Sequence, residues 1–98
     1  MRALYFEEFN GPLVIKDLPI PTPNPKAVVI KVIATGLCRS DWHAYVGHDT
    51  DIKLPHVPGH EFAGTIHQVG TEVKNFKVND RVTVPFVNGC GECELCKS

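Results

Sequence analysis

The chain has 98 residues, 21% charged side chains and a formal net charge of −1, values typical of one ordinary globular domain. The near-neutral charge argues against a nucleic-acid or anionic-membrane partner, and apolar runs such as Val28–Ile30 fall far short of the ~20 residues that cross a bilayer. Acidic residues interrupt the N-terminal segment from Glu7 onward, so no signal peptide is predicted and we expect a cytoplasmic protein.

The first quarter of the chain is predicted to form two short strands and an extended connection. Residues 2–6 and 13–18 are rich in branched and aromatic side chains, and Asn10-Gly11-Pro12 between them is a strong turn signal. We therefore expect a hairpin or two adjacent strands. Four prolines follow within residues 19–25 and exclude both a helix and a central strand there.

The next segment is predicted to be a strand followed by a short helix. Residues 27–35 give the strongest strand prediction, which ends at Gly36. Residues 38–46 lack the alternation of a strand, and Ser40-Asp41 is typical of a helix start. Gly47 is expected to end this helix because glycine readily adopts the left-handed conformation that follows a last turn.

The second half is predicted to contain two more strands. Residues 48–58 read as a polar loop, and strands are expected over residues 61–69 and 81–87, with a turn at Asn79 before the second. The last ten residues show no periodicity and are predicted to be a loop. Many short strands divided by glycine and proline turns, with little helix, favour a β-barrel or a β-sandwich.

Three cysteines near the end of the chain predict a metal site. Cys90, Cys93 and Cys96 are spaced so that their thiolates can converge on one tetrahedral zinc ion, and the interspersed glycines let the backbone wrap closely around it. A structural zinc has four ligands, of which three are visible here. The alternative is two disulfides that include Cys38, which fits poorly with the spacing and with the absence of an export signal.

A second group of residues has the composition of a catalytic metal site. Cys38 ends one predicted strand and His60 opens another, and one thiolate with one imidazole leaves coordination positions open for a substrate. Asp41 is placed to accept a proton from the far nitrogen of a ligating histidine. Ser40 and His43 lie one helical turn apart, a spacing that allows them to pass a proton outward.

Each of these residues also has an ordinary structural interpretation. A single buried cysteine is usually a small apolar side chain, and a single histidine is usually a satisfied polar group. The neighbouring Gly59 and Glu61, together with the second cysteine cluster, favour the metal interpretation. The remaining histidines lack such neighbours and are expected to be surface or packing residues: His48, His56 and His67.

Two segments, Gly36–Asp41 and Gly59–Gly64, followed by Val69-Gly70 and Asp80–Val82, resemble the zinc-containing medium-chain alcohol dehydrogenase family. The resemblance implies a mainly β fold, a GroES-like partly open β-barrel with a short helix. It implies that residues 1–98 are the N-terminal part of the zinc-binding catalytic domain, and that the nicotinamide-binding Rossmann domain of the family is absent from this chain, which by itself is then expected to be inactive.

The resemblance also assigns metal ligands. Cys38 and His60 match ligands of the catalytic zinc, for which one histidine and two cysteines are the established set in alcohol dehydrogenases. Cys90, Cys93 and Cys96 match three of the four thiolates of a structural zinc. The third catalytic ligand and the fourth structural ligand are expected beyond the last residue.

Five further residues receive roles from the same resemblance. Ser40 matches the hydroxyl that takes the alcohol proton, and His43 the outer member of that relay. Asp41 matches the partner of the ligating histidine, and Glu61 an acid beside the zinc. Arg39 falls where some family members place a basic residue near the coenzyme pyrophosphate.

The expected function is therefore hydride transfer between a small alcohol or aldehyde and NAD or NADP, with catalytic and structural zinc. The complete enzyme is expected to be a homodimer or homotetramer with no nucleic-acid or membrane partner. The alternative is a GroES-like structural module that binds zinc and catalyses nothing. Such a module accounts for the cysteine cluster near the end of the chain but leaves Cys38, Ser40, His43 and His60 unexplained.

Overall fold

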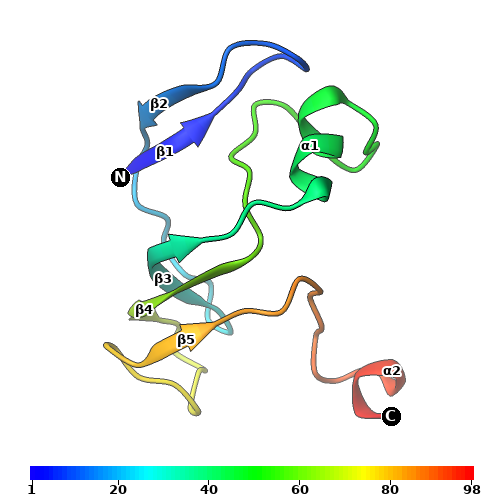
Figure 1. Ribbon diagram of the computed structural model, residues 1–98. Coiled ribbons are helices and arrows are strands. Elements are labelled where there is room, and N and C mark those ends of the chain that lie inside the picture. The colour runs from blue at the N-terminus through cyan, green and yellow to red at the C-terminus, as the bar shows by residue number, and fades with distance from the viewer.

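The computed structural model describes residues 1–98 and is mainly β, with short helices at two places (Figure 1). Five strands form two separate antiparallel sheets, one of two strands and one of three in the order β3-β4-β5. The prediction of a mainly β fold is thereby confirmed. The elements in chain order are β1 (Arg2–Tyr5), β2 (Val14–Asp17), β3 (Val28–Thr35), α1 (Arg39–Val46), β4 (Phe62–Val69), β5 (Arg81–Thr83) and α2 (Glu94–Lys97).

The first sheet is the predicted hairpin. β1 pairs with β2 from Arg2 opposite Asp17 to Tyr5 opposite Val14. Asn10 adopts a left-handed φ of 57° in the connection, which asparagine tolerates because its short side chain hydrogen-bonds locally. The backbone N–H of Asn10 donates to Tyr45 on α1 at 3.0 Å, so the hairpin loop is held against the helix.

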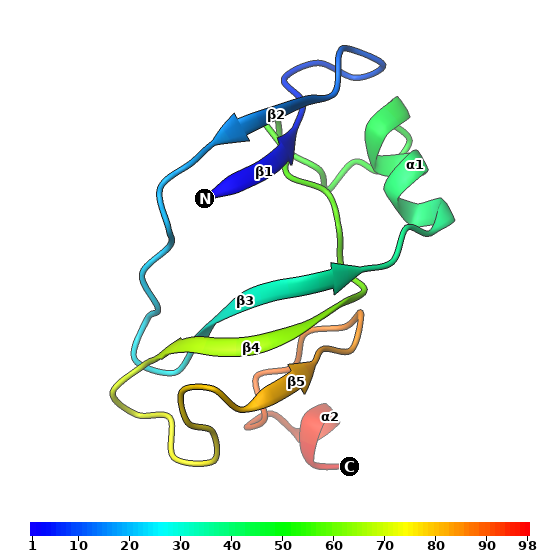
Figure 2. The ribbon, with the colours of Figure 1, turned by 60° about the vertical axis from the view of Figure 1, so that its left-hand side comes forward.

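The second sheet contains the longest pairing of the molecule. β3 and β4 run from Val28 opposite Val69 to Thr35 opposite Phe62, with two irregularities in the register along β3. β5 adds only three residues to the other side of β4 (Figure 2). The predicted strand over residues 81–87 is therefore too long. Pro85 has no N–H to donate to the ladder, which explains why pairing ends at Thr83.

The helix α1 begins one residue earlier than its predicted start signal. Cys38 precedes it in extended conformation, and the Asp41 carboxylate accepts the Cys38 backbone N–H at 3.0 Å. This bond satisfies a donor that the helix itself leaves free. Gly47 ends the helix with φ 83°, as predicted.

The last ten residues, predicted to be a loop, contain the single-turn helix α2. Within it, the N–H of Lys97 donates to the carbonyl of Cys93 at 3.1 Å. Helices this short show no hydrophobic period, so the sequence carries no signal for them. The segment is tied to the chain just before β3 by an ion pair between Lys26 and Glu92, 3.1 Å long.

The buried core is small. Only 7 of 98 residues are buried, and the largest fully buried side chains are Phe6 and Ile66. Large apolar side chains elsewhere are exposed, among them Ile33 on β3 (70% exposed) and Leu37 (84% exposed). Neither helix has the length and apolar character needed to cross a membrane.

Candidate metal centres

Cys38 and His60 meet where the N-terminal end of α1 faces the segment that leads into β4. The Sγ atom of Cys38 lies 3.1 Å from Nε2 of His60, although the two residues are 22 positions apart. Cys38 directly precedes the helix, and His60 directly precedes the Glu61–Phe62 entry to β4. The structure thus brings together the thiol and the imidazole that the sequence suggested as ligands of one metal ion.

Asp41 connects the residues around this centre through its side-chain hydrogen bonds. Its side chain is 6% exposed and accepts hydrogen bonds from the backbone N–H groups of Cys38 (3.0 Å) and Gly59 (3.2 Å). Oδ1 of Asp41 also lies 3.3 Å from Nδ1 of His60. A carboxylate in this position fixes the orientation of the imidazole, so that Nε2 is the nitrogen that faces the thiol of Cys38.

Ser40 lies within hydrogen-bonding distance of both groups. Its Oγ is 2.8 Å from Sγ of Cys38 and 3.1 Å from Nε2 of His60. The hydrogen bond to Ser40 is the main reason why the pKa of the Cys38 thiol is lowered below its ordinary value of 9.0. Burial lowers the pKa of His60, but the hydrogen bond to Cys38 and the charge of Asp41 outweigh it and raise that pKa above 6.5. Both shifts favour an oppositely charged thiolate and imidazolium.

Glu61 lies beside the same loop, over the backbone of Gly36. The Gly36 N–H donates to the carbonyl of Glu61 at 2.7 Å, and a Cβ atom on Gly36 would come 2.7 Å from Oε2 of the Glu61 side chain. Gly36 therefore leaves room for this carboxylate two residues before Cys38. The sequence places Gly36 at the end of a strand and in the Gly36–Asp41 segment, but it gives no signal for the room that Glu61 needs.

His43 and Arg39 make their contacts away from the thiol. Nδ1 of His43 lies 3.1 Å from Nδ1 of His48, and Ser40 hydrogen-bonds to Cys38 and His60 instead. The guanidinium of Arg39 lies over the ring of Trp42 at 5.1 Å. His48 was expected to be a surface or packing residue, and it is exposed with its ring against those of Trp42 and His43. Its position directly after the glycine that ends the helix is the signal for this contact, because a side chain there commonly meets the residue five positions back.

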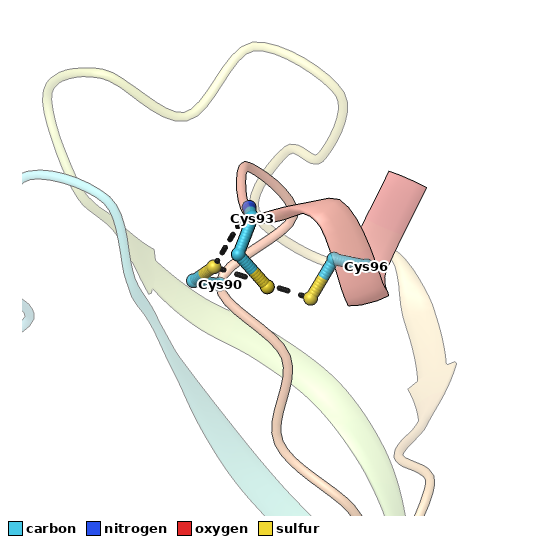
Figure 3. A group of neighbouring side chains, drawn as sticks. All are labelled: Cys90, Cys93 and Cys96. Carbon is cyan, nitrogen blue, oxygen red and sulfur yellow. Dashed lines mark hydrogen bonds between the residues drawn. The ribbon is translucent and has the colours of Figure 1, made fainter. Parts of the chain in front are cut away.

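The second centre is the cysteine lobe, defined as Cys90, Cys93 and Cys96 (Figure 3). Their three sulfur atoms lie within 4.8 Å of one another, and Sγ of Cys90 is 3.9 Å from Sγ of Cys96. Gly91 adopts φ 74°, which lets the chain reverse between the first two thiols. All three residues are exposed.

The donor atoms of both centres suit zinc. Thiolate sulfur and imidazole nitrogen are its preferred ligands in proteins, and both centres hold such atoms close enough together to share an ion. At the first centre the second nitrogen of His60 is already held by a carboxylate, as is usual for a ligating histidine.

The thiol of Cys90 is expected to ionise at a lower pH than an ordinary cysteine. Backbone N–H groups of Glu92 (3.4 Å) and Cys93 (3.3 Å) donate to its sulfur and lower its pKa from 9.0 to about 7. After removal of metal by a chelator, alkylation of Cys90 by iodoacetamide should reach half its maximal rate near pH 7, since the thiolate is the reacting form. Because the tryptic peptide over residues 82–97 carries all three cysteines, tandem mass spectrometry with fragmentation between Cys90 and Cys93 measures the rate at Cys90.

The matched control for Cys90 is the same chain in concentrated guanidinium chloride, where the two N–H donors are lost. There the midpoint should rise back toward the ordinary value of 9.0. An identical midpoint in the folded and denatured chains would contradict the assignment.

Comparison with known proteins finds alcohol dehydrogenases among the proteins similar to this chain. Residues 24–98 match the family described as the alcohol dehydrogenase GroES-like domain. The chain is 41% identical over 93 residues to alcohol dehydrogenase 1 of Emericella nidulans, covering 93% of this chain and 27% of that protein.

Two solved structures show the same likeness. An alcohol dehydrogenase from E. coli CFT073, solved with NADH, is 42% identical with a TM-score of 0.82 over 99% of this chain. The zinc-dependent alcohol dehydrogenase 2 from Streptococcus pneumonia is 33% identical with a TM-score of 0.85, again over 99% of this chain. In both cases this chain spans 28% of the length of the protein it matches.

Proposed function

The chain belongs to the family of alcohol dehydrogenase GroES-like domains, and from that membership we propose that it is the N-terminal part of the catalytic domain of a zinc-dependent alcohol dehydrogenase. The complete enzyme transfers a hydride between an alcohol or aldehyde and NAD or NADP. The NADH complex of the E. coli relative and the zinc-dependent relative support this assignment. The same proposal places a coenzyme-binding domain in the remainder of the enzyme. It also expects the rest of the catalytic domain to cover the exposed side chains of Ile33 and Leu37.

Two zinc positions are part of this proposal. Cys38 and His60 would hold the catalytic ion, and the cysteine lobe would hold the structural one. When bound, zinc supplies Lewis acidity toward the alcohol oxygen and the coenzyme supplies the hydride chemistry. The thiolate-favouring environment of Cys38 supports its role as a ligand, because the thiolate is the form that binds metal.

The surrounding side chains orient the ligands and handle the proton. Asp41 holds the His60 ring through Nδ1, which leaves Nε2 for the metal. Ser40 accepts the proton of the alcohol and passes it outward along α1 toward His43. Glu61 is the acidic side chain beside the two proposed metal ligands, Cys38 and His60.

Arg39, at the exposed start of α1, is proposed to face the coenzyme pyrophosphate. Its stacking on Trp42 holds the guanidinium at this end of the helix.

The position of Ser40 is the observation that carries the catalytic interpretation. A hydroxyl within 2.8 Å of the thiol and 3.1 Å of the imidazole stands where it could accept the proton of an alcohol held beside these two side chains. A non-catalytic zinc module needs only the cysteine lobe and gives no reason for this second, differently composed cluster.

The partner of the complete enzyme is then a small alcohol or aldehyde. We propose a homodimer or homotetramer in the cytoplasm, a compartment consistent with clustered free thiols. A reducing environment keeps such thiols available for metal.

Ser40→Ala tests this function. In the complete enzyme, alcohol-dependent reduction of NAD or NADP should fall about a hundredfold, because general acid–base groups contribute typically 10²–10⁴. The zinc content should stay unchanged, since Ser40 is not a ligand. Steady-state kinetics and elemental analysis measure the two effects.

Ser40→Thr is the matched control, because it keeps the hydroxyl and should retain most of the rate. A wild-type enzyme with bound zinc but no turnover of any alcohol would refute the proposed function. An active Ser40→Ala enzyme would refute the role of Ser40 alone.

A further inference from the structure

The end of α1 places two imidazoles in contact. Gly47 donates to the carbonyl of Ala44 at 3.4 Å and His48 donates to the carbonyl of His43 at 3.0 Å, with Gly47 in the left-handed conformation. This is the Schellman arrangement, in which the side chains of the two outer residues usually form an apolar contact. Here both positions carry histidine, and their Nδ1 atoms lie 3.1 Å apart.

An Nδ1-to-Nδ1 contact of this length requires one shared proton. A neutral imidazole carries one N–H and one bare nitrogen, so the contact is a hydrogen bond only if one ring is protonated at Nδ1 and the other is not. Two Nδ1–H groups would repel. In the neutral pair, His43 and His48 must therefore be opposite tautomers, and one ring exposes a bare Nε2 while the other exposes an Nε2–H.

Trp42 holds the two rings in this orientation. Its indole packs edge-on against His43, with ring centres 5.0 Å apart, and against His48 at 5.3 Å. His43 is half-buried and His48 is exposed, so the pair extends from the helix toward water. Ser40 stands one helical turn before His43, on the same side of α1.

We propose that His48 positions His43 and forms the solvent outlet of the proton path of this site, an inference that rests on the proposed function. A proton arriving from the Ser40 side forms a bond to Nε2 of His43. The Nδ1–H bond of His43 then breaks as an N–H bond forms at Nδ1 of His48, and the Nε2–H of His48 breaks to release a proton to water. One proton enters and one leaves. The starting tautomers return when water protonates Nε2 of His48, the Nδ1 proton of His48 passes back to Nδ1 of His43, and Nε2 of His43 loses its proton to water.

The proposal is tested with His48→Asn and His48→Phe in the complete enzyme. Asparagine keeps a polar group near the Nδ1 position and phenylalanine keeps the packing against Trp42, but neither can pass a proton. Both variants should slow the pre-steady-state formation of reduced coenzyme about three- to tenfold, with an unchanged KM for the alcohol, because water replaces the outlet only in part. Added imidazole should restore most of the rate.

His67→Asn on β4 is the control for this test, because His67 is an exposed histidine outside both centres. The rate of the His67→Asn enzyme, like that of the wild type, should not change when imidazole is added. An unchanged rate in His48→Asn would overturn the outlet role, and so would a loss that imidazole does not restore, since that indicates a purely structural effect.

A spectroscopic measurement tests the shared proton independently of the proposed function. In the ¹⁵N-histidine-labelled complete protein, long-range ¹H–¹⁵N spectra recorded where both rings are neutral should show His43 and His48 as opposite tautomers. Identical tautomers would overturn the shared proton whether or not the enzyme oxidises alcohols. An enzyme without alcohol turnover but with opposite tautomers would refute the proposed function and would still support the shared proton between His43 and His48.

Discussion

Cys38→Ala and His60→Ala are each expected to abolish alcohol oxidation by the complete enzyme. Each change removes one of two donor atoms that lie 3.1 Å apart, and the ion they would share supplies several kcal/mol of charge stabilisation, equal to about a thousandfold in rate or more. The zinc content should fall by one ion per subunit. Elemental analysis beside steady-state kinetics checks both effects.

The cysteine lobe provides the comparison for these two variants. Cys96→Ala should also remove one zinc ion. The main effect should be a lower thermal stability, because structural zinc contributes folding free energy. The molecules that remain folded should keep most of their catalytic rate. A His60→Ala enzyme with wild-type zinc content and rate would show that the first centre is not a metal site.

Gly64→Ala is expected to disrupt the second sheet. A Cβ atom at Gly64 would overlap the backbone carbonyl of Lys31 on β3, and a backbone carbonyl cannot rotate away as a side chain can. β3 and β4 would have to separate at their pairing of Val32 with Gly64, beside the buried Ile66. Overpacking of this kind costs about 3 kcal/mol, a large share of a typical domain stability. The midpoint of urea unfolding measures the loss.

Gly36→Ala is the matched glycine-to-alanine control. Its added Cβ would come 2.7 Å from Oε2 of Glu61, which can rotate away, and 3.3 Å from the Glu61 Cβ, which needs only a small shift, so the unfolding midpoint should fall much less than in Gly64→Ala. The same variant should shift Glu61 and therefore lower the rate of the complete enzyme. Equal destabilisation by the two substitutions would show that the overlap at Gly64 is relieved by small backbone movements.

The sequence alone was sufficient for features that depend on a few neighbouring residues. The hairpin turn, the left-handed Gly47 and the left-handed Asn79 follow from local backbone preferences, which do not depend on the rest of the fold. The grouping of the three cysteines in the lobe is equally local, because residues three apart are close in any tight turn.

Residues far apart in the sequence were placed by the tertiary structure. The sequence suggested Cys38 and His60 as ligands from their types, but their 3.1 Å approach depends on Asp41, which joins the start of α1 to the backbone of Gly59. Burial of that carboxylate among its donors is a property of the packed chain, with no periodic signal in the sequence.

The amino-acid sequence alone predicted the strands, the longer of the two short helices and the two groups of metal-binding residue types. Two side-chain placements came only from packing in three dimensions: Gly36 leaves room for Glu61, and His43 contacts His48. The physical reason is the range of the interactions. Backbone propensities act over a few residues, whereas the direction of a side chain depends on every element packed against it.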